Sequence, residues 1–182
     1  GCARGCNIEV HTNKHRHHHN EGRRVARLKP RFNADVNKWW ICDAGRYGFR
    51  WLDDESRLTA PRVTVEGQSV ETTWDDAMAT FAGRLSQYRP EEIGVLASPQ
   101  MSNEDLFALH RIAGRLGIRA VDHRVPPRVP GDEDNLLIRA DKNPNRRGAE
   151  LIGLTQGETA AILDGARQRR IKLLWIFQHD LL

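Results

Sequence analysis

The sequence predicts an α/β protein, in which a small β-rich unit over residues 1–60 precedes the start of a layered α/β domain over residues 61–182. Two observations predict this division. Strand-like and helix-like patterns alternate from residue 74 to residue 177, as in domains whose helices cover a mostly parallel sheet. The three cysteines all lie within the first 42 residues, and a polar stretch that ends at Pro61 separates them from that alternation.

The charge of the chain is uneven along its 182 residues. Residues 1–50 hold 11 Lys and Arg against 4 Asp and Glu, whereas residues 51–182 hold 17 and 20. The basic excess therefore surrounds the cysteines, where it fits a phosphate-binding face, charge balance for an anionic cluster, or a docking face for an acidic partner. We expect no nucleic acid, because no nucleic-acid-binding motif is present, and no membrane span, because no apolar run is long enough.

The cysteines have a spacing that suits an iron–sulfur cluster. Cys2 and Cys6 are separated by a short Gly-containing turn, and the distant Cys42 can close a cage around a cluster. A [4Fe–4S] cluster takes four thiolates, so we expect an N-terminal truncation and a fourth cysteine upstream of Gly1. Two alternatives stay open at this point: unrelated, inert thiols, and a zinc ion held by the same thiolates with a histidine.

Short elements are predicted around the cysteines. Residues 7–10 are extended, and residues 24–29 alternate polar and apolar as a half-buried strand does, with Pro30 at its end. The His-rich stretch His11–His19 between them fits a solvated hairpin loop better than a metal site. Trp39 and Trp40 lead up to Cys42, where we interpret them as a dry shell for a cluster or as a hydrophobic anchor. Backbone N–H groups near Gly45 are candidate donors to cluster sulfurs.

The second part of the chain carries stronger patterns. A helix is predicted from Trp74 to Leu85, because apolar residues recur at helical spacing after Thr73, which can cap it. The continuous apolar run 93–97 is typical of a buried parallel strand. The other predicted elements are a hairpin over 63–71, helices over 102–116 and 158–170, and strands over 118–122, 136–140 and 171–177. The chain ends directly after the last strand, so we also expect a C-terminal truncation.

Catalytic motifs are not evident. The sequence has no GxGxxG motif and no P-loop. Gly153–Gly157 contains glycines but no Lys, and we interpret it as an ordinary loop. No Asp, His and Ser residues have a spacing that requires a triad. We therefore predict no catalytic residues in this part of the protein.

Several short motifs together resemble the molybdopterin oxidoreductase family. Within it, the sequence is most similar to the branch formed by the large iron–sulfur subunits of NADH-quinone oxidoreductases (respiratory complex I). The segments that carry the resemblance are Cys2–Ile8, Val36–Asn37, Ile41–Arg46, Thr73–Ala77, Asn103–Asp105 and Arg139–Asn145.

The resemblance implies a [4Fe–4S] domain in which Cys2, Cys6 and Cys42 are ligands and the first ligand falls two positions before Gly1. It also implies that Trp40, Gly45 and Arg46 form the surroundings of the cluster. The loop from Cys6 to Cys42 is longer than is usual in the family.

The resemblance further implies an electron-transfer subunit of NADH:quinone oxidoreductase. Such a subunit would act as an enzyme only within the complex, with the other peripheral-arm subunits as partners, on the cytoplasmic side of a bacterial inner membrane. The alternatives are a molybdopterin-dependent enzyme such as formate dehydrogenase, and a scaffold that has lost its cluster. Molybdenum enzymes usually carry Lys two residues after the last cluster Cys, where this chain has Ala44, so molybdopterin is not expected.

Overall fold

The computed structural model describes residues 1–15, 22–125, 131–154 and 158–179. Two compact units divide the chain. The first contains Gly1–Arg57 together with Val125–Arg146, and the second contains Leu58–Arg124 together with Arg147–Leu182. The sequence placed the boundary near residue 60 and all later residues in the second domain. In the structure, by contrast, a later segment, Val125–Arg146, belongs to the first unit. We call it the returning segment.

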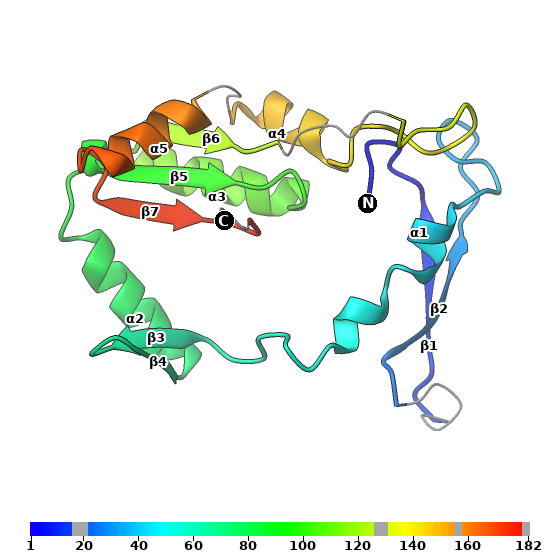
Figure 1. Ribbon diagram of the computed structural model, residues 1–182, viewed down its shortest axis with the longest axis horizontal. Coiled ribbons are helices and arrows are strands. Elements are labelled where there is room, and N and C mark those ends of the chain that lie inside the picture. The colour runs from blue at the N-terminus through cyan, green and yellow to red at the C-terminus, as the bar shows by residue number, and fades with distance from the viewer. Residues whose placement is uncertain (16–21, 126–130, 155–157, 180–182) are drawn as a thin grey trace. The chain divides into compact units, whose positions relative to one another are not determined.

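The first unit is built on a two-stranded antiparallel sheet. Strand β1 (Ile8–Thr12) pairs with β2 (Val25–Pro30), with an irregularity in the register at His11 and Thr12. After β2 come the five-residue helix α1 (Asp43–Tyr47) and a 3-10 helix, Arg50–Asp53 (Figure 1). The predicted extended segments are therefore present, whereas a helix at α1 was not predicted.

The returning segment does not contain the strand that the sequence predicted over residues 136–140. One Asp134 carboxylate oxygen accepts hydrogen bonds from the backbone N–H groups of Leu136 (3.0 Å), Leu137 (2.5 Å) and Ile138 (2.8 Å). A side chain that captures consecutive N–H groups competes with the ladder of a sheet. The apolar residues that suggested a strand lie in the first unit instead, where the Leu137 side chain is buried.

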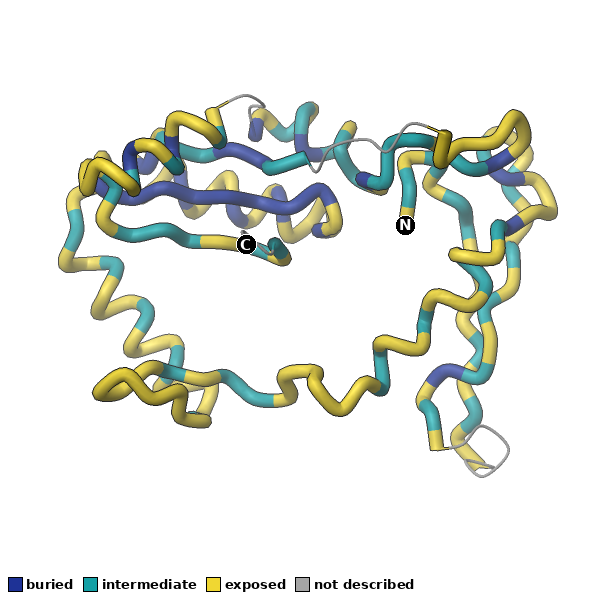
Figure 2. The backbone as a smooth tube through the Cα atoms, viewed as in Figure 1, coloured by how far each residue is buried: buried dark blue, intermediate teal, exposed yellow. Residues whose placement is uncertain are grey.

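The second unit contains a three-stranded parallel sheet in the order β6-β5-β7. Every residue of the central strand is buried, as its continuous apolar sequence predicted, and Figure 2 shows this strand in the colour of buried residues throughout. The strands are β5 (Ile93–Ala97), β6 (Ala120–His123) and β7 (Leu173–Ile176). The prediction of an α/β fold with parallel strands is thereby confirmed.

Helices accompany this sheet in the order that the sequence predicted, with one addition. Helix α3 (Asn103–Arg115) is capped by Ser102 and buries Leu106 and Leu109 in the core. Helix α5 (Thr159–Arg167) precedes β7. Helix α4 (Arg146–Ile152) was not predicted, because its polar first turn reads as a loop.

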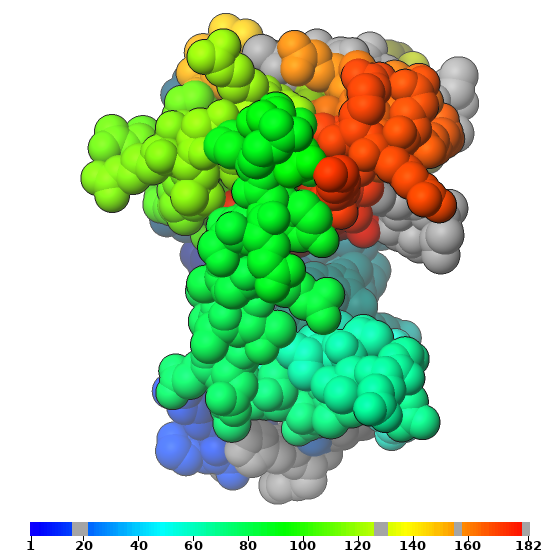
Figure 3. All heavy atoms as spheres, turned by 90° about the vertical axis from the view of Figure 1, so that its left-hand side faces the viewer, coloured from blue at the N-terminus to red at the C-terminus, as the bar shows by residue number. Residues whose placement is uncertain are grey.

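A hairpin and a helix extend from the beginning of the second unit. The hairpin consists of β3 (Arg62–Val65) and β4 (Gln68–Glu71), and helix α2 (Trp74–Leu85) follows it with Thr73 as its cap. The predicted apolar stripe of α2 is only partly covered. Phe81 stacks on Trp175 at 4.9 Å between ring centroids, while Trp74 is 69% exposed. Figure 3 shows α2 running between the hairpin and the sheet of this unit.

Gly94 in the central strand tests how tightly the sheet and α5 pack. A Cβ atom at this position would lie 2.7 Å from Ile162 Cγ2 and 3.1 Å from Leu174 Cδ2. Gly94→Ala should therefore lower the free energy of unfolding by about 1–3 kcal/mol through overpacking. In Gly114→Ala, the matched control, the added methyl meets nothing within 4 Å inside α3, so stability should rise by about 0.5–1 kcal/mol. Urea unfolding of both variants measures this, and equal effects would contradict the described packing.

Glu92 links the start of β5 to the segment before β7 and makes stability depend on pH. Lys172 Nζ donates to Glu92 Oε1 at 2.5 Å and Arg89 N donates to Oε2 at 3.0 Å, and together they lower the pKa of the Glu92 carboxyl from 4.5 to about 2. Because the pKa in the folded state lies below that in the unfolded state, the stabilisation is complete above pH 4.5 and disappears as the pH falls towards 2. Glu92→Gln should unfold more easily at neutral pH and lose stability less steeply in acid. Thermal unfolding across this pH range is the test, and parallel pH curves for variant and wild type would contradict it.

Candidate metal centre

Cys2 and Cys6 lie on either side of a tight turn. Gly5 N donates to the Cys2 carbonyl oxygen at 3.3 Å, and Gly5 has a φ of +67°, a left-handed conformation that glycine adopts without strain. The turn is fastened to the returning segment, because Ala3 N donates to the carbonyl oxygen of Asp141 at 2.8 Å. The short spacing of the two cysteines therefore has a defined backbone geometry.

Cys42 is positioned by a buried amide earlier in its own loop. Asn37 is 2% exposed, and its Oδ1 accepts from Asn7 N at 3.0 Å. Its Nδ2 donates to the Trp40 carbonyl oxygen at 3.0 Å and to that of Arg31 at 3.2 Å. This side chain therefore connects the residue after Cys6 with the loop that leads to Cys42. From sequence, Asn37 is recognisable only as part of a motif, since a buried amide leaves no periodic signal.

The thiol of Cys42 caps helix α1. Its Sγ accepts from Gly45 N at 3.4 Å, which agrees with the expectation that backbone N–H groups near Gly45 point towards sulfur. A side chain at Gly45 would collide with Ile41, whose Cγ1 atom would lie 2.8 Å from the added Cβ. A glycine is therefore required here by close packing.

The three cysteines line one cavity of about 390 Å³ in the first unit. All three are free thiols of intermediate exposure. The other lining residues are the apolar Ile8, Ile41, Ile138 and Pro144, the charged Asp132 and Lys142, and the small Gly1, Gly5, Ala44 and Gly45. Residues that lie far apart in the sequence thus meet around the thiols, as a cluster site requires.

Two residues expected around a cluster do not line the cavity itself. Arg46 and Trp40 are not among the described residues that line the cavity. Trp40 is 58% exposed, and Trp39 is 69% exposed and stacks on Phe32 at 4.3 Å between ring centroids. The apolar wall is formed by isoleucines and a proline instead. Ile138 and Pro144 could not be assigned to it from sequence, because nothing in their spacing connects them to the cysteines.

The electrostatics of the cavity disfavour three free thiolates. Burial raises the pKa of the Cys6 thiol, and the neighbouring charges of Cys2 and Cys42 raise it further, while Arg4 lowers it. The buried Nε of Arg4 has no hydrogen-bond partner within the described part of the chain. Positive metal ions bound to the sulfurs would relieve this electrostatic penalty, so the three thiols fit an iron–sulfur cluster.

A metal site is not preformed in the described part of the chain. No group of three or more His, Cys, Asp or Glu side chains there, the three cysteines included, is arranged to hold a metal ion. In the His-rich stretch, His11 Nε2 lies 3.4 Å from Glu9 Oε2. Residues 16–21, which hold most of the remaining histidines of this stretch, lie outside the described residues.

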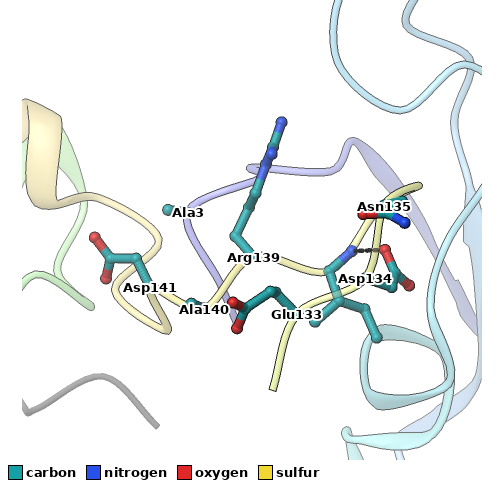
Figure 4. A pocket seen from close by; sticks show the side chains of 8 residues that line it. Ala3, Glu133, Asp134, Asn135, Arg139, Ala140 and Asp141 are labelled. Atoms are coloured by element: carbon teal, nitrogen blue, oxygen red, sulfur yellow. Dashed lines mark hydrogen bonds between the residues drawn. The ribbon is translucent and has the colours of Figure 1, made fainter. Parts of the chain in front are cut away.

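A second, polar hollow of about 610 Å³ shares Ile138 with the cysteine cavity. Figure 4 shows its lining side chains, with the Asp134 carboxylate bonded to backbone N–H and the Arg139 side chain directed away from it. Two of its acidic residues, Asp134 and Asp141, accept hydrogen bonds from backbone N–H groups of the returning segment. The same segment forms part of the wall of the cysteine cavity.

A buried polar pair in the second unit was not predicted. Asp122 and His123, at the end of β6, are both fully buried. Asp122 Oδ2 accepts from Thr159 N at 2.7 Å and also bonds the Thr159 hydroxyl, so it anchors the first turn of α5. This role is structural.

Comparison with known proteins gives relatives of two kinds. The chain is 31% identical to the mitochondrial NADH-ubiquinone oxidoreductase 78 kDa subunit of Candida albicans over an alignment that covers 96% of the chain. It is 37% identical over 108 residues, 59% of its length, to NADH-quinone oxidoreductase subunit 3 of Thermus thermophilus. It is 31% identical over 123 residues, 67% of its length, to the F420-dependent formate dehydrogenase 2 subunit alpha of Methanococcus maripaludis.

These matches cover small parts of the relatives. The chain spans 24%, 13% and 17% of their respective lengths. No protein-family model matches the chain.

Asn37 offers a test of how the loop positions Cys42. Asn37→Ala would leave the partners of its amide without hydrogen bonds in a buried setting, at a cost of about 1–3 kcal/mol for each unsatisfied group. We expect a lower urea midpoint and faster alkylation of Cys42. Asn13→Ala, which removes a hydrogen bond from His15 N away from the cysteine cavity, is the control and should change both quantities less. A Cys42 alkylation rate equal to wild type in Asn37→Ala would contradict the positioning role.

Proposed function

We propose that this chain, which belongs to the molybdopterin oxidoreductase superfamily with the large subunits of NADH-quinone oxidoreductases and formate dehydrogenases, binds a [4Fe–4S] cluster through Cys2, Cys6 and Cys42. The observation that carries the proposal is the single cavity that all three thiols line. A cluster bound there supplies one-electron transfer.

The residues around the thiols have separate tasks in this proposal. Gly5 gives the turn that presents two sulfurs together, and Gly45 N–H donates to the third. Ile41 and Ile138 limit the access of water to the sulfurs, which sets the polarity around the metal and therefore its potential. The positive charge of Arg4 lowers the pKa of the Cys6 thiol and so favours its ionised, metal-binding form.

The proposed cluster needs a fourth ligand. Four thiolates hold a cluster of this type, and this chain has three cysteines. The cluster domain would then comprise residues 1–60 and the returning segment, with the rest of the chain as the first part of the larger domain.

We further propose that the whole protein is the electron-transfer subunit of an NADH:quinone oxidoreductase. The support is the long match to the Candida albicans subunit and Ala44, which occupies the position where molybdenum enzymes usually have Lys. Its partners would be the other subunits of the peripheral arm, at the cytoplasmic face of a bacterial inner membrane. Within the described ranges, no helix is both long and apolar enough to cross a membrane.

The alternative is a molybdopterin-dependent formate dehydrogenase. The similarity to the alpha subunit of Methanococcus maripaludis favours it. In that case the second unit would belong to a cofactor-binding domain, and the cluster would receive electrons from the cofactor.

Anaerobic metal analysis of the full-length protein distinguishes the two functions. We expect acid-labile sulfide together with iron, a reduced-cluster EPR signal and no molybdenum. Cys42→Ser should lose or strongly perturb that signal, because the thiolate is a ligand, whereas Asn13→Ala should keep it. Molybdenum with pterin would favour the formate dehydrogenase function, and a preparation without iron would contradict the cluster.

A further inference from the structure

We propose that the ion pair of Lys142 and Asp132 sets the reduction potential of the cluster. This inference rests on the proposed function, since it concerns the same cavity. Both residues lie far from the cysteines in sequence. Their charges would determine how readily the cluster accepts an electron.

The position of the pair supports this role. Lys142 and Asp132 are the two charged residues among the described residues that line the cysteine cavity. They come from the returning segment of the first unit, which is attached to the cysteine turn through the hydrogen bond from Ala3 N to the Asp141 carbonyl oxygen. The charges are therefore held beside the thiols by the backbone of the unit.

The ammonium group of Lys142 is well fixed for a side chain of this length. Its Nζ donates to the carbonyl oxygen of Asp132 at 2.6 Å and to that of Arg139 at 3.0 Å. It also lies 3.2 Å from Asp132 Oδ2, with the Lys142 side chain 37% exposed and that of Asp132 57% exposed. Two carbonyl acceptors would hold the ammonium in place even if the carboxylate lost its charge.

Opposite effects on the potential follow from these two charges. Reduction adds one negative charge to the cluster, so a nearby cation stabilises the reduced form and a nearby anion destabilises it. The intact pair has little net charge. Removing Lys142 leaves the negative charge of Asp132 uncompensated beside the cavity and should make reduction harder. Removing the charge of Asp132 leaves the ammonium group and should make reduction easier.

The test is an EPR-monitored redox titration of the full-length protein. Lys142→Met should lower the equilibrium constant for reduction of the cluster about tenfold. For a one-electron couple this is a shift of about 59 mV to lower potential. Asp132→Asn should shift the potential in the opposite direction, and the double variant should return close to the wild-type value. If Lys142→Met does not assemble the cluster, the Asp132→Asn variant alone tests the inference. A shift of its potential to a higher value would support the inference.

Matched controls make the same charge changes outside the cavity. Arg139→Met and Glu133→Gln alter neighbouring residues that line the second hollow but not the cysteine cavity, and they should change the reduction equilibrium less than twofold. Potentials of both pair variants within twofold of wild type, or shifts in the same direction, would overturn the inference while leaving the cluster in place. A wild-type protein without a cluster would instead overturn the proposed function, and this inference with it.

Discussion

Negative charge in a confined space is the main constraint on the first unit. The Cys6 thiol is harder to ionise because it is partly buried and because Cys2 and Cys42 lie close by. Three thiolates are therefore unfavourable in this cavity unless positive charge joins them. The excess of basic residues in the first fifty positions and the Arg4 side chain both act in that direction, and iron would supply most of the compensation.

The cavity depends on contacts across a long stretch of sequence. A two-stranded sheet alone is marginally stable, and β1 leaves Ile8 and Val10 exposed. The buried Asn37 amide and the returning segment supply the additional connections. The first unit is consequently discontinuous in sequence, because part of its cavity wall follows the sheet strands β5 and β6 along the chain. Its integrity should therefore depend on the second unit being present as a covalent link.

The second unit was the easier part to predict from sequence. The continuous apolar run of β5 and the helical spacing in α3 are local signals, and both elements formed as expected. The strand predicted over residues 136–140 was wrong, because the Asp134 carboxylate captures the N–H groups that a sheet would have used. The stripe on α2 was a correct helix signal, but periodicity alone does not show that Trp74 stays exposed.

The candidate site was only half predictable. The spacing of Cys2, Cys6 and Cys42 identified the thiols, and the structure gathers them around one cavity. The tryptophan shell stays a prediction: Trp40 is exposed and does not line this cavity, and nearness in sequence to Cys42 does not decide on which side of the backbone a ring lies. Ile138 and Lys142 reach the cavity through tertiary contacts that no local pattern records.

The most direct test of a shared site is the joint protection of the three cysteines from alkylation. The full-length protein would be treated anaerobically with iodoacetamide before and after removal of iron by a chelator, and modification of each cysteine measured by mass spectrometry. Our account predicts that Cys2, Cys6 and Cys42 are all protected in the iron-loaded protein and become reactive together when iron is removed. Ready alkylation of any one of them in the iron-loaded protein would contradict its assignment as a ligand.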